Sequence, residues 1–139
     1  MLANDHRCSR SYAYGDFLSQ GVKLALGTDA PTAGNSTLHN LYVATTRKSP
    51  HPRHAHLPPT TLQWAVPMVE ALQAATKGAA WASKMEDRVG ELKEGMQMDA
   101  VILSCDIMAS STADDGSDIL KARVDETWLA GKRSYSASS

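Results

Sequence analysis

The sequence predicts an α/β fold, because a helix, a short strand and a turn follow one another near its start. Residues 9–20 space their apolar side chains as a helix does, and Gly21 follows where that helix would end. The apolar run 22–26 (VKLAL) is compatible with a short strand, and Gly-Thr-Asp-Ala-Pro turns the chain directly after it. This order is typical of one step of an α/β architecture.

Two further helices are predicted, with a long loop between them. Residues 36–47 begin with Ser36, a good helix cap, and carry apolar side chains on overlapping helical positions. The segment 48–61 has four prolines and three histidines among few apolar residues, which indicates an exposed loop. Pro67 suits the first turn of a helix that Gly78 interrupts before it resumes.

The last third of the sequence predicts a small sheet. Glycines bracket a short polar hairpin at 90–95, and an apolar strand follows at 100–104. Residues 122–135 alternate apolar and polar side chains and turn at Gly131-Lys132. The remaining residues, 136–139, are expected to be a frayed tail.

The composition argues against several classes of partner. With 14 lysines and arginines against 15 aspartates and glutamates, the net charge is -1, and no basic surface for nucleic acid or an anionic membrane is predicted. Cys8 and Cys105 lie in unrelated contexts without metal-ligand spacing, which predicts reduced thiols. No apolar run approaches the ~20 residues of a membrane helix, and charges stand where a signal peptide is apolar. We therefore expect a cytoplasmic protein.

Asp29 is the first candidate for chemistry. It comes directly after the predicted strand 22–26, and α/β proteins gather their active sites at the carboxyl ends of strands. An aspartate before an alanine-proline pair also suits a turn, in which its side chain would bond the nearby backbone. Local sequence favours the turn, and both interpretations stay open on these residues alone.

Histidines and one arginine supply the other candidates. His54 and His56, preceded by His51, form an H-x-H pair that offers two nitrogens to zinc if the segment is extended. No nearby acid completes a ligand set, so a solvated loop is favoured. On the second predicted helix, His39 could reach a substrate or could serve packing alone. Arg47, at the end of that helix, could clamp an anion or stabilise the helix C-terminus.

Five segments then follow one another in a recognisable order: GVKLALGTDAP, LYVATTR, EALQAATKGAA, VGELKEGMQMDAVIL and ARVDETWLAGKRSY. Together they resemble the C-terminal part of the amidohydrolase superfamily, in its amidohydrolase-3 branch, over about residues 10–135. Members are metal-dependent hydrolases with a (β/α)8 barrel and a small β-sandwich built from both ends of the chain. The resemblance implies that residues 1–88 hold the last barrel strand and C-terminal helices. It places part of the sandwich and the frayed tail in residues 89–139.

The resemblance also gives Asp29 a role. Through the G-T-D-A-P motif it matches the aspartate that closes the family's metal site at the end of the eighth barrel strand. There a divalent ion, usually zinc, makes water acidic near neutral pH, and the carboxylate accepts a proton and returns it to the leaving amine. Asp99 matches the aspartate of a family Ala-Asp pair, with Met98 in place of the alanine, and is expected to be structural.

The same resemblance limits what this chain is expected to do. A complete barrel needs about 250 residues, and the family's metal-binding histidines precede the position of Asp29, so His54 and His56 do not replace them. We expect part of an amidohydrolase that acts on carbon–nitrogen bonds other than peptide bonds, in small amides or cyclic amides, and that is inactive alone. Exposed barrel edges predict marginal stability, self-association, or a compact structure mainly within residues 60–135.

Two points stay open in the sequence. No residue is assigned to substrate binding, because the loops that would carry it belong to the rest of the barrel. The alternative function is a non-enzymatic interaction or regulatory protein that uses its His-rich loop, 48–61, for metal or partner contact.

Overall fold

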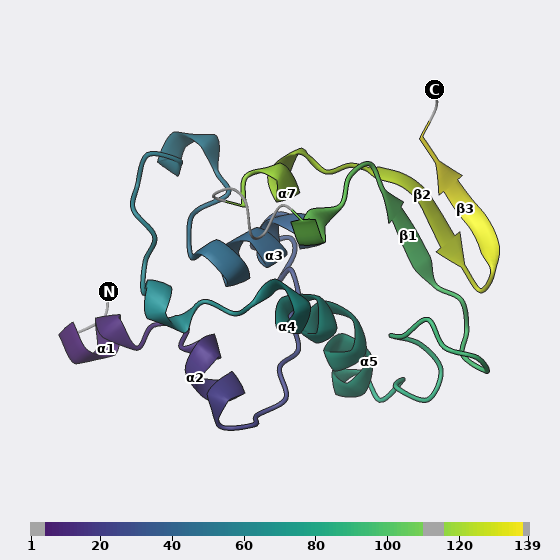
Figure 1. Cartoon of the computed structure of the whole chain (residues 1–139), viewed down its shortest axis with the longest axis horizontal. Coiled ribbons are helices and arrows are strands. Elements are labelled where there is room, and N and C mark those ends of the chain that lie inside the picture. Colours follow the sequence, from purple (N-terminus) through teal and green to yellow (C-terminus); the bar gives the residue numbers. More distant parts are fainter. Residues whose placement is uncertain (1–4, 110–115, 138–139) are drawn as a thin grey trace.

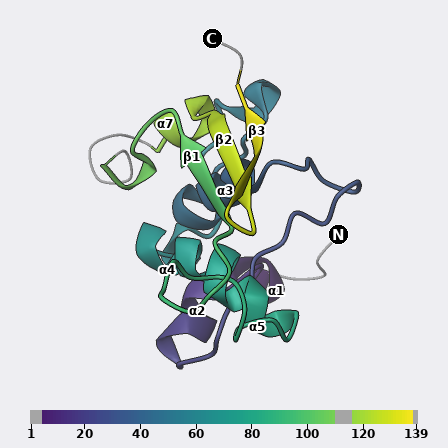
Figure 2. The same ribbon diagram turned by 90° about the vertical axis from the view of Figure 1, so that its right-hand side faces the viewer.

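A computed structural model describes residues 5–109 and 116–137, which form a helical part and a small sheet beside it (Figure 1). The α-helices are α1 (Asp5–Ser9), α2 (Tyr14–Ser19), α3 (Thr37–Thr46), α4 (Met68–Gln73), α5 (Ala79–Ala82) and α7 (Asp118–Lys121). The strands are β1 (Ala100–Leu103), β2 (Val124–Leu129) and β3 (Lys132–Ser136). Two short 3-10 helices, η1 (Pro52–His54) and η2 (Leu62–Trp64), and a π-helix, η3 (Ala74–Gly78), complete these elements. Viewed from the side of the sheet, the strands lie in front of α3 (Figure 2).

The helix predicted over 9–20 is confirmed only in part, as α2, and a separate short helix, α1, ends at Ser9. Tyr12 lies between them with a φ of 53°, in the left-handed region that a continuous helix does not tolerate. Gly21, with a φ of 73°, follows α2 and confirms the predicted stop, since glycine adopts this conformation without steric cost.

The strand predicted at 22–26 is wrong. This segment is irregular, and Leu26 donates its N–H to the carbonyl oxygen of Ala74 at 3.0 Å instead of joining a sheet. A strand needs a neighbouring strand to bond its backbone. Within the described residues, the sheet consists of β1, β2 and β3 alone and lies elsewhere in the fold.

The helix that follows Pro67 is continuous through Gly78, so the predicted interruption is also wrong. Gly78 has a helical φ of -64°, and the π-helical turn η3 carries the chain from α4 into α5. The glycine serves close packing instead, because a Cβ added there would overlap the carbonyl oxygen of Leu24. The π-turn and the glycine together let segment 22–26 lie directly against this helix.

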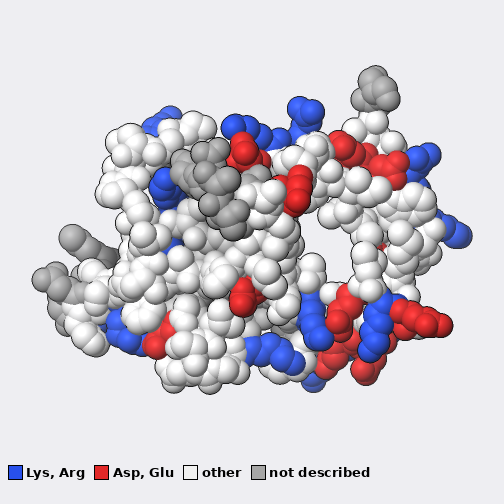
Figure 3. Space-filling view, viewed as in Figure 1, with Lys and Arg blue, Asp and Glu red and all other residues white. Residues whose placement is uncertain are grey.

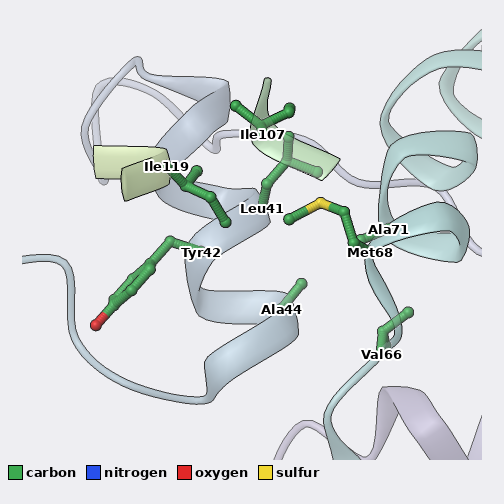
Figure 4. Packing of buried hydrophobic residues seen from close by; sticks show 8 residues of the cluster. All are labelled: Leu41, Tyr42, Ala44, Val66, Met68, Ala71, Ile107 and Ile119. Carbon is green, nitrogen blue, oxygen red and sulfur yellow. The ribbon is translucent and has the colours of Figure 1, made fainter. Parts of the chain in front are cut away.

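Helix α3 stands at the centre of the hydrophobic core. The core cluster has eight buried members, drawn as sticks in Figure 4: Leu41, Tyr42, Ala44, Val66, Met68, Ala71, Ile107 and Ile119. Three of these come from α3. The alternative of a compact structure mainly within residues 60–135 therefore fails, because α3 lies outside that range and supplies much of the core.

The predicted helix over 36–47 is confirmed as α3. Ser36 precedes its first residue, although its side chain makes no capping hydrogen bond within the described part of the chain. Arg47 ends the helix with a φ of 59°, the left-handed conformation typical of helix ends. The loop predicted at 48–61 is confirmed as largely exposed, with only η1 inside it.

The C-terminal sheet is antiparallel in the order β1-β2-β3, as the alternating pattern predicts. Its hairpin turns at Ala130 and Gly131, with φ values of 50° and 74°, one residue earlier than predicted. Ser136 belongs to β3, so the tail begins later than expected, and residues 138–139 lie outside the described part. The hairpin predicted at 90–95 forms turns but no strands.

Asp99 ties the first strand to this hairpin. Its carboxylate accepts the N–H of Ala130 at 2.7 Å, and the carbonyl of Met98 accepts the N–H of Gly131 at 2.9 Å. The Ala130 N–H and, next, the amide of Gln97 hold the pKa of the Asp99 carboxyl below its usual range. These contacts give Asp99 the structural part expected for it.

The sheet leaves apolar side chains uncovered on the side of α5. A cavity of about 840 Å³ lies there, and Figure 3 shows the surface open between sheet and helices. Val101 and Leu129 line it and are 55% and 58% exposed. Charges of both signs are interspersed on the face drawn in Figure 3.

Candidate functional site

Asp29 lies on the exposed loop between segment 22–26 and α3. Its φ of 54° is a left-handed conformation that aspartate tolerates better than most residues. Its backbone carbonyl closes a turn by accepting the N–H of Ala33 at 3.1 Å. Among the described residues, the carboxylate itself has no hydrogen-bond partner. The turn therefore uses the backbone of Asp29 and leaves its side chain available.

Two anchors hold this loop against the helices. Asn40, on α3, donates its side-chain N–H to the carbonyl oxygen of Gly27 at 2.6 Å. On the other side, Leu26 bonds to Ala74 of η3 as described above. The loop leaves the body of the protein between these two contacts. Asp29 follows Gly27 by two positions, so its backbone is fixed close to α3.

The described residues do not complete a metal site around Asp29. No group of three or more His, Cys, Asp or Glu side chains able to hold a metal occurs within 5–109 and 116–137. A catalytic zinc needs three protein ligands, and a structural zinc needs four. A single carboxylate falls short of either set, so any metal at this position requires ligands from outside the described residues.

The His-rich loop does not take the form that the H-x-H prediction requires. His54 ends the 3-10 helix η1 and His56 lies in the turn after it, so the segment is not extended. The rings of His51 and His54 lie 5.4 Å apart, and His51 accepts the backbone N–H of Arg53 through Nδ1 at 3.1 Å. The solvated loop is the better description of these histidines.

The remaining candidates differ in what surrounds them. His39 is half-buried on α3, next to the anchoring Asn40. Arg47 is buried, and its Nη2 donates to the carbonyl of Ser11 and to the hydroxyl of Thr61. No local pattern indicates the Asn40 anchor, because its partner Gly27 lies 13 residues earlier.

Comparison with known proteins decides the family. A family model described as "Amidohydrolase family" matches residues 1–135. The chain belongs to the amidohydrolase family. This confirms the resemblance seen in the sequence, including its amidohydrolase-3 branch.

Relatives of this amidohydrolase chain are considerably longer. It is 31% identical over 134 residues to Protein LONG AFTER FAR-RED 3 of Arabidopsis thaliana. The aligned region covers 96% of this chain and 21% of that protein. It is 30% identical over 107 residues to YtcJ of Bacillus subtilis (strain 168), a protein assigned by name to the amidohydrolases, covering 77% of this chain and 20% of that one. The chain thus spans about a fifth of the length of the curated relatives that it matches.

A solved structure supports the fold. The guanine deaminase from Bradyrhizobium japonicum superposes with a TM-score of 0.56 at 22% identity, over 94% of this chain and 36% of the deaminase. The mixed helix and sheet arrangement therefore resembles part of that amidohydrolase fold. No helix in the described ranges is long and apolar enough to cross a membrane.

Proposed function

We propose that this amidohydrolase chain supplies an acid–base carboxylate, Asp29, to a hydrolase of carbon–nitrogen bonds other than peptide bonds. The family match over residues 1–135 carries this proposal, because it includes the G-T-D-A-P motif. The exposed position of Asp29 and the absence of a side-chain partner within the described residues are consistent with it. Small amides or cyclic amides in the cytoplasm are the proposed substrates.

In this proposal Asp29 acts first as a general base and then as a general acid. It accepts a proton from the attacking water and returns it to the leaving amine, so the nitrogen departs as a neutral group. A divalent metal such as zinc, if held by ligands outside the described residues, would supply water that is acidic near neutral pH. Segment 22–26 is irregular in this chain, and we propose that it takes the position of the last barrel strand only where further barrel strands lie beside it.

We therefore propose that the 139-residue chain is inactive alone. Segment 22–26 pairs with no strand within the described residues, and apolar side chains line the 840 Å³ cavity. Both features favour self-association or association with the rest of a barrel.

A zinc titration with matched variants tests the role of Asp29. Isothermal calorimetry is run on the wild type, on Asp29→Ala and on the double variant His54→Ala/His56→Ala, with hydrolysis of an amide panel measured in parallel. We expect no turnover by the wild type, and any zinc binding that depends on the loop histidines to be weak. Tight stoichiometric binding lost in Asp29→Ala would support a residual catalytic site at Asp29. Tight binding lost only in the double variant would favour the non-enzymatic alternative. Zinc-dependent turnover by the chain alone, abolished by Asp29→Asn, would contradict its proposed inactivity.

A further inference from the structure

Arg47 carries a buried charge without a counter-ion among the described residues. The residue is only 6% exposed. No carboxylate among the described residues forms an ion pair with its guanidinium. Nη2 donates to the hydroxyl of Thr61 at 3.0 Å and to the carbonyl of Ser11 at 3.4 Å, whereas Nε is shielded from solvent and has no partner there. Burying an unpaired charge is costly, so a bound anion would relieve this position.

The guanidinium lines a pocket of suitable size for a small ligand. The cavity has a volume of about 400 Å³, within the range of small-molecule sites. Tyr12 and Tyr14 form part of its wall, with ring centres 6.0 Å and 5.7 Å from the guanidinium carbon. Leu57 and Pro58 add apolar surface. Lys48 also lines this pocket, beside the buried guanidinium. A largely apolar and aromatic wall with these two basic residues is suited to an organic anion.

We propose that this pocket binds a small organic carboxylate. The carboxylate accepts hydrogen bonds from guanidinium donors that the protein leaves unused, a pairing whose geometry arginine favours. The apolar body of the ligand lies against Tyr12, Tyr14 and the wall from the 48–61 loop. The positive charges of Arg47 and Lys48, which both line the pocket, favour a negatively charged ligand, and the apolar wall favours one with an organic body.

This site is separate from the Asp29 loop and does not rest on the proposed function. Asn40, which anchors that loop, lies near the start of α3, whereas Arg47 follows its last residue. The rise of an α-helix separates the two positions by about 10 Å. Loss of hydrolysis in an Asp29 variant would therefore leave carboxylate binding at Arg47 intact.

The test is a titration of the 139-residue chain with benzoate, followed by two-dimensional NMR. Benzamide, which has the same shape without the charge, is the ligand control. We expect saturable benzoate binding with the largest shifts at Tyr12 and Tyr14, and affinity for benzamide lower by about tenfold or more, as loss of a charged hydrogen bond implies. Arg47→Met should weaken benzoate binding by a similar factor. Arg53→Met, which changes an exposed arginine on the same loop, should leave it unchanged.

Several results would overturn the proposal. These are equal binding of benzamide, unchanged benzoate affinity in Arg47→Met, shifts confined to residues away from Tyr12 and Tyr14, or no saturable shift at about 10 mM benzoate. If Arg47→Met fails to fold, the comparison of the two ligands on the wild type decides the question. Phosphate binding as tight as benzoate would also contradict the assignment, since it would indicate a general anion site.

Discussion

The carbonyl of Leu24 lies against the α-carbon of Gly78, and a methyl group on that carbon would overlap the carbonyl oxygen. This contact joins segment 22–26 to the helix formed by α4, η3 and α5. With the hydrogen bond from Leu26 to Ala74, it fixes the chain that leads into the Asp29 loop. The helix therefore serves as the support on which that loop is built.

Gly78→Ala should destabilise the protein. In an ordinary helix this change stabilises by about 0.5–1 kcal/mol, because alanine loses less backbone entropy on folding. Here the new methyl group must displace the backbone at Leu24, and overpacking of this kind costs about 1–3 kcal/mol. Urea unfolding followed by circular dichroism measures the difference. Gly34→Ala is the matched control, since nothing lies within 4 Å of its added Cβ. A stabilised Gly78→Ala protein would show that segment 22–26 does not lie on this helix.

Asn40→Ala should loosen the loop that carries Asp29. The change removes the hydrogen bond to the Gly27 carbonyl, which contributes about 1 kcal/mol. Hydrogen exchange of peptides covering 27–35 should accelerate, while the core around Leu41 keeps its protection. His39→Ala, which changes the neighbouring helical residue, should have a much smaller effect on that loop. An unchanged hydrogen-exchange rate of residues 27–35 in Asn40→Ala would show that the hydrogen bond from Asn40 to Gly27 does not hold the loop.

The free energy of unfolding should depend on pH in the acid range because of Asp99. Its carboxyl has a pKa below the unfolded value, because the Ala130 N–H, the Gln97 amide and, more weakly, Arg88 favour its ionised form. The contribution is therefore fully present above about pH 4 and is lost as the pH falls through the lower, folded pKa. Asp99→Asn should lower the Tm at pH 7, and its difference from wild type should shrink at low pH.

The control for this pH dependence is Asp87→Asn, at an exposed aspartate in a neighbouring turn. Its melting profile against pH should follow the wild type. An Asp99→Asn difference that stayed constant from neutral to acid pH would point to packing, and not to the charge, as the source of the effect.

Local signals predicted much of the fold correctly. Helix α3 carries its own stop at Arg47, and the hairpin of β2 and β3 carries its turn at Ala130-Gly131. Both are determined by residues close in sequence. Segment 22–26 has the composition of a strand but finds no strand beside it within the described residues, and sheet formation depends on that distant partner. The helical pattern likewise reveals neither the π-turn at η3 nor the close approach of Leu24 to Gly78.

The candidate site was predictable to a smaller extent. The motif around Asp29 and its order among the other segments made this residue the candidate, whereas its left-handed backbone and the Asn40 anchor came only from the structure. Arg47 was considered as an anion clamp or as a helix-end cation, and its burial beneath Tyr12 and Tyr14 was not visible in the sequence. Burial depends on which segments meet in space, and periodicity alone does not report that.

The central claim is that Asp29 provides the acid–base carboxylate of a carbon–nitrogen hydrolase. The most direct test is to express the longest in-frame product that contains this chain and to assay it with added zinc. The assay follows the release of ammonia or amine from a panel of amides and cyclic amides. We predict turnover that Asp29→Asn reduces by about 10²-fold or more, as loss of a general acid–base does, while the exposed control Asp87→Asn keeps it. Turnover unchanged in Asp29→Asn would contradict the claim.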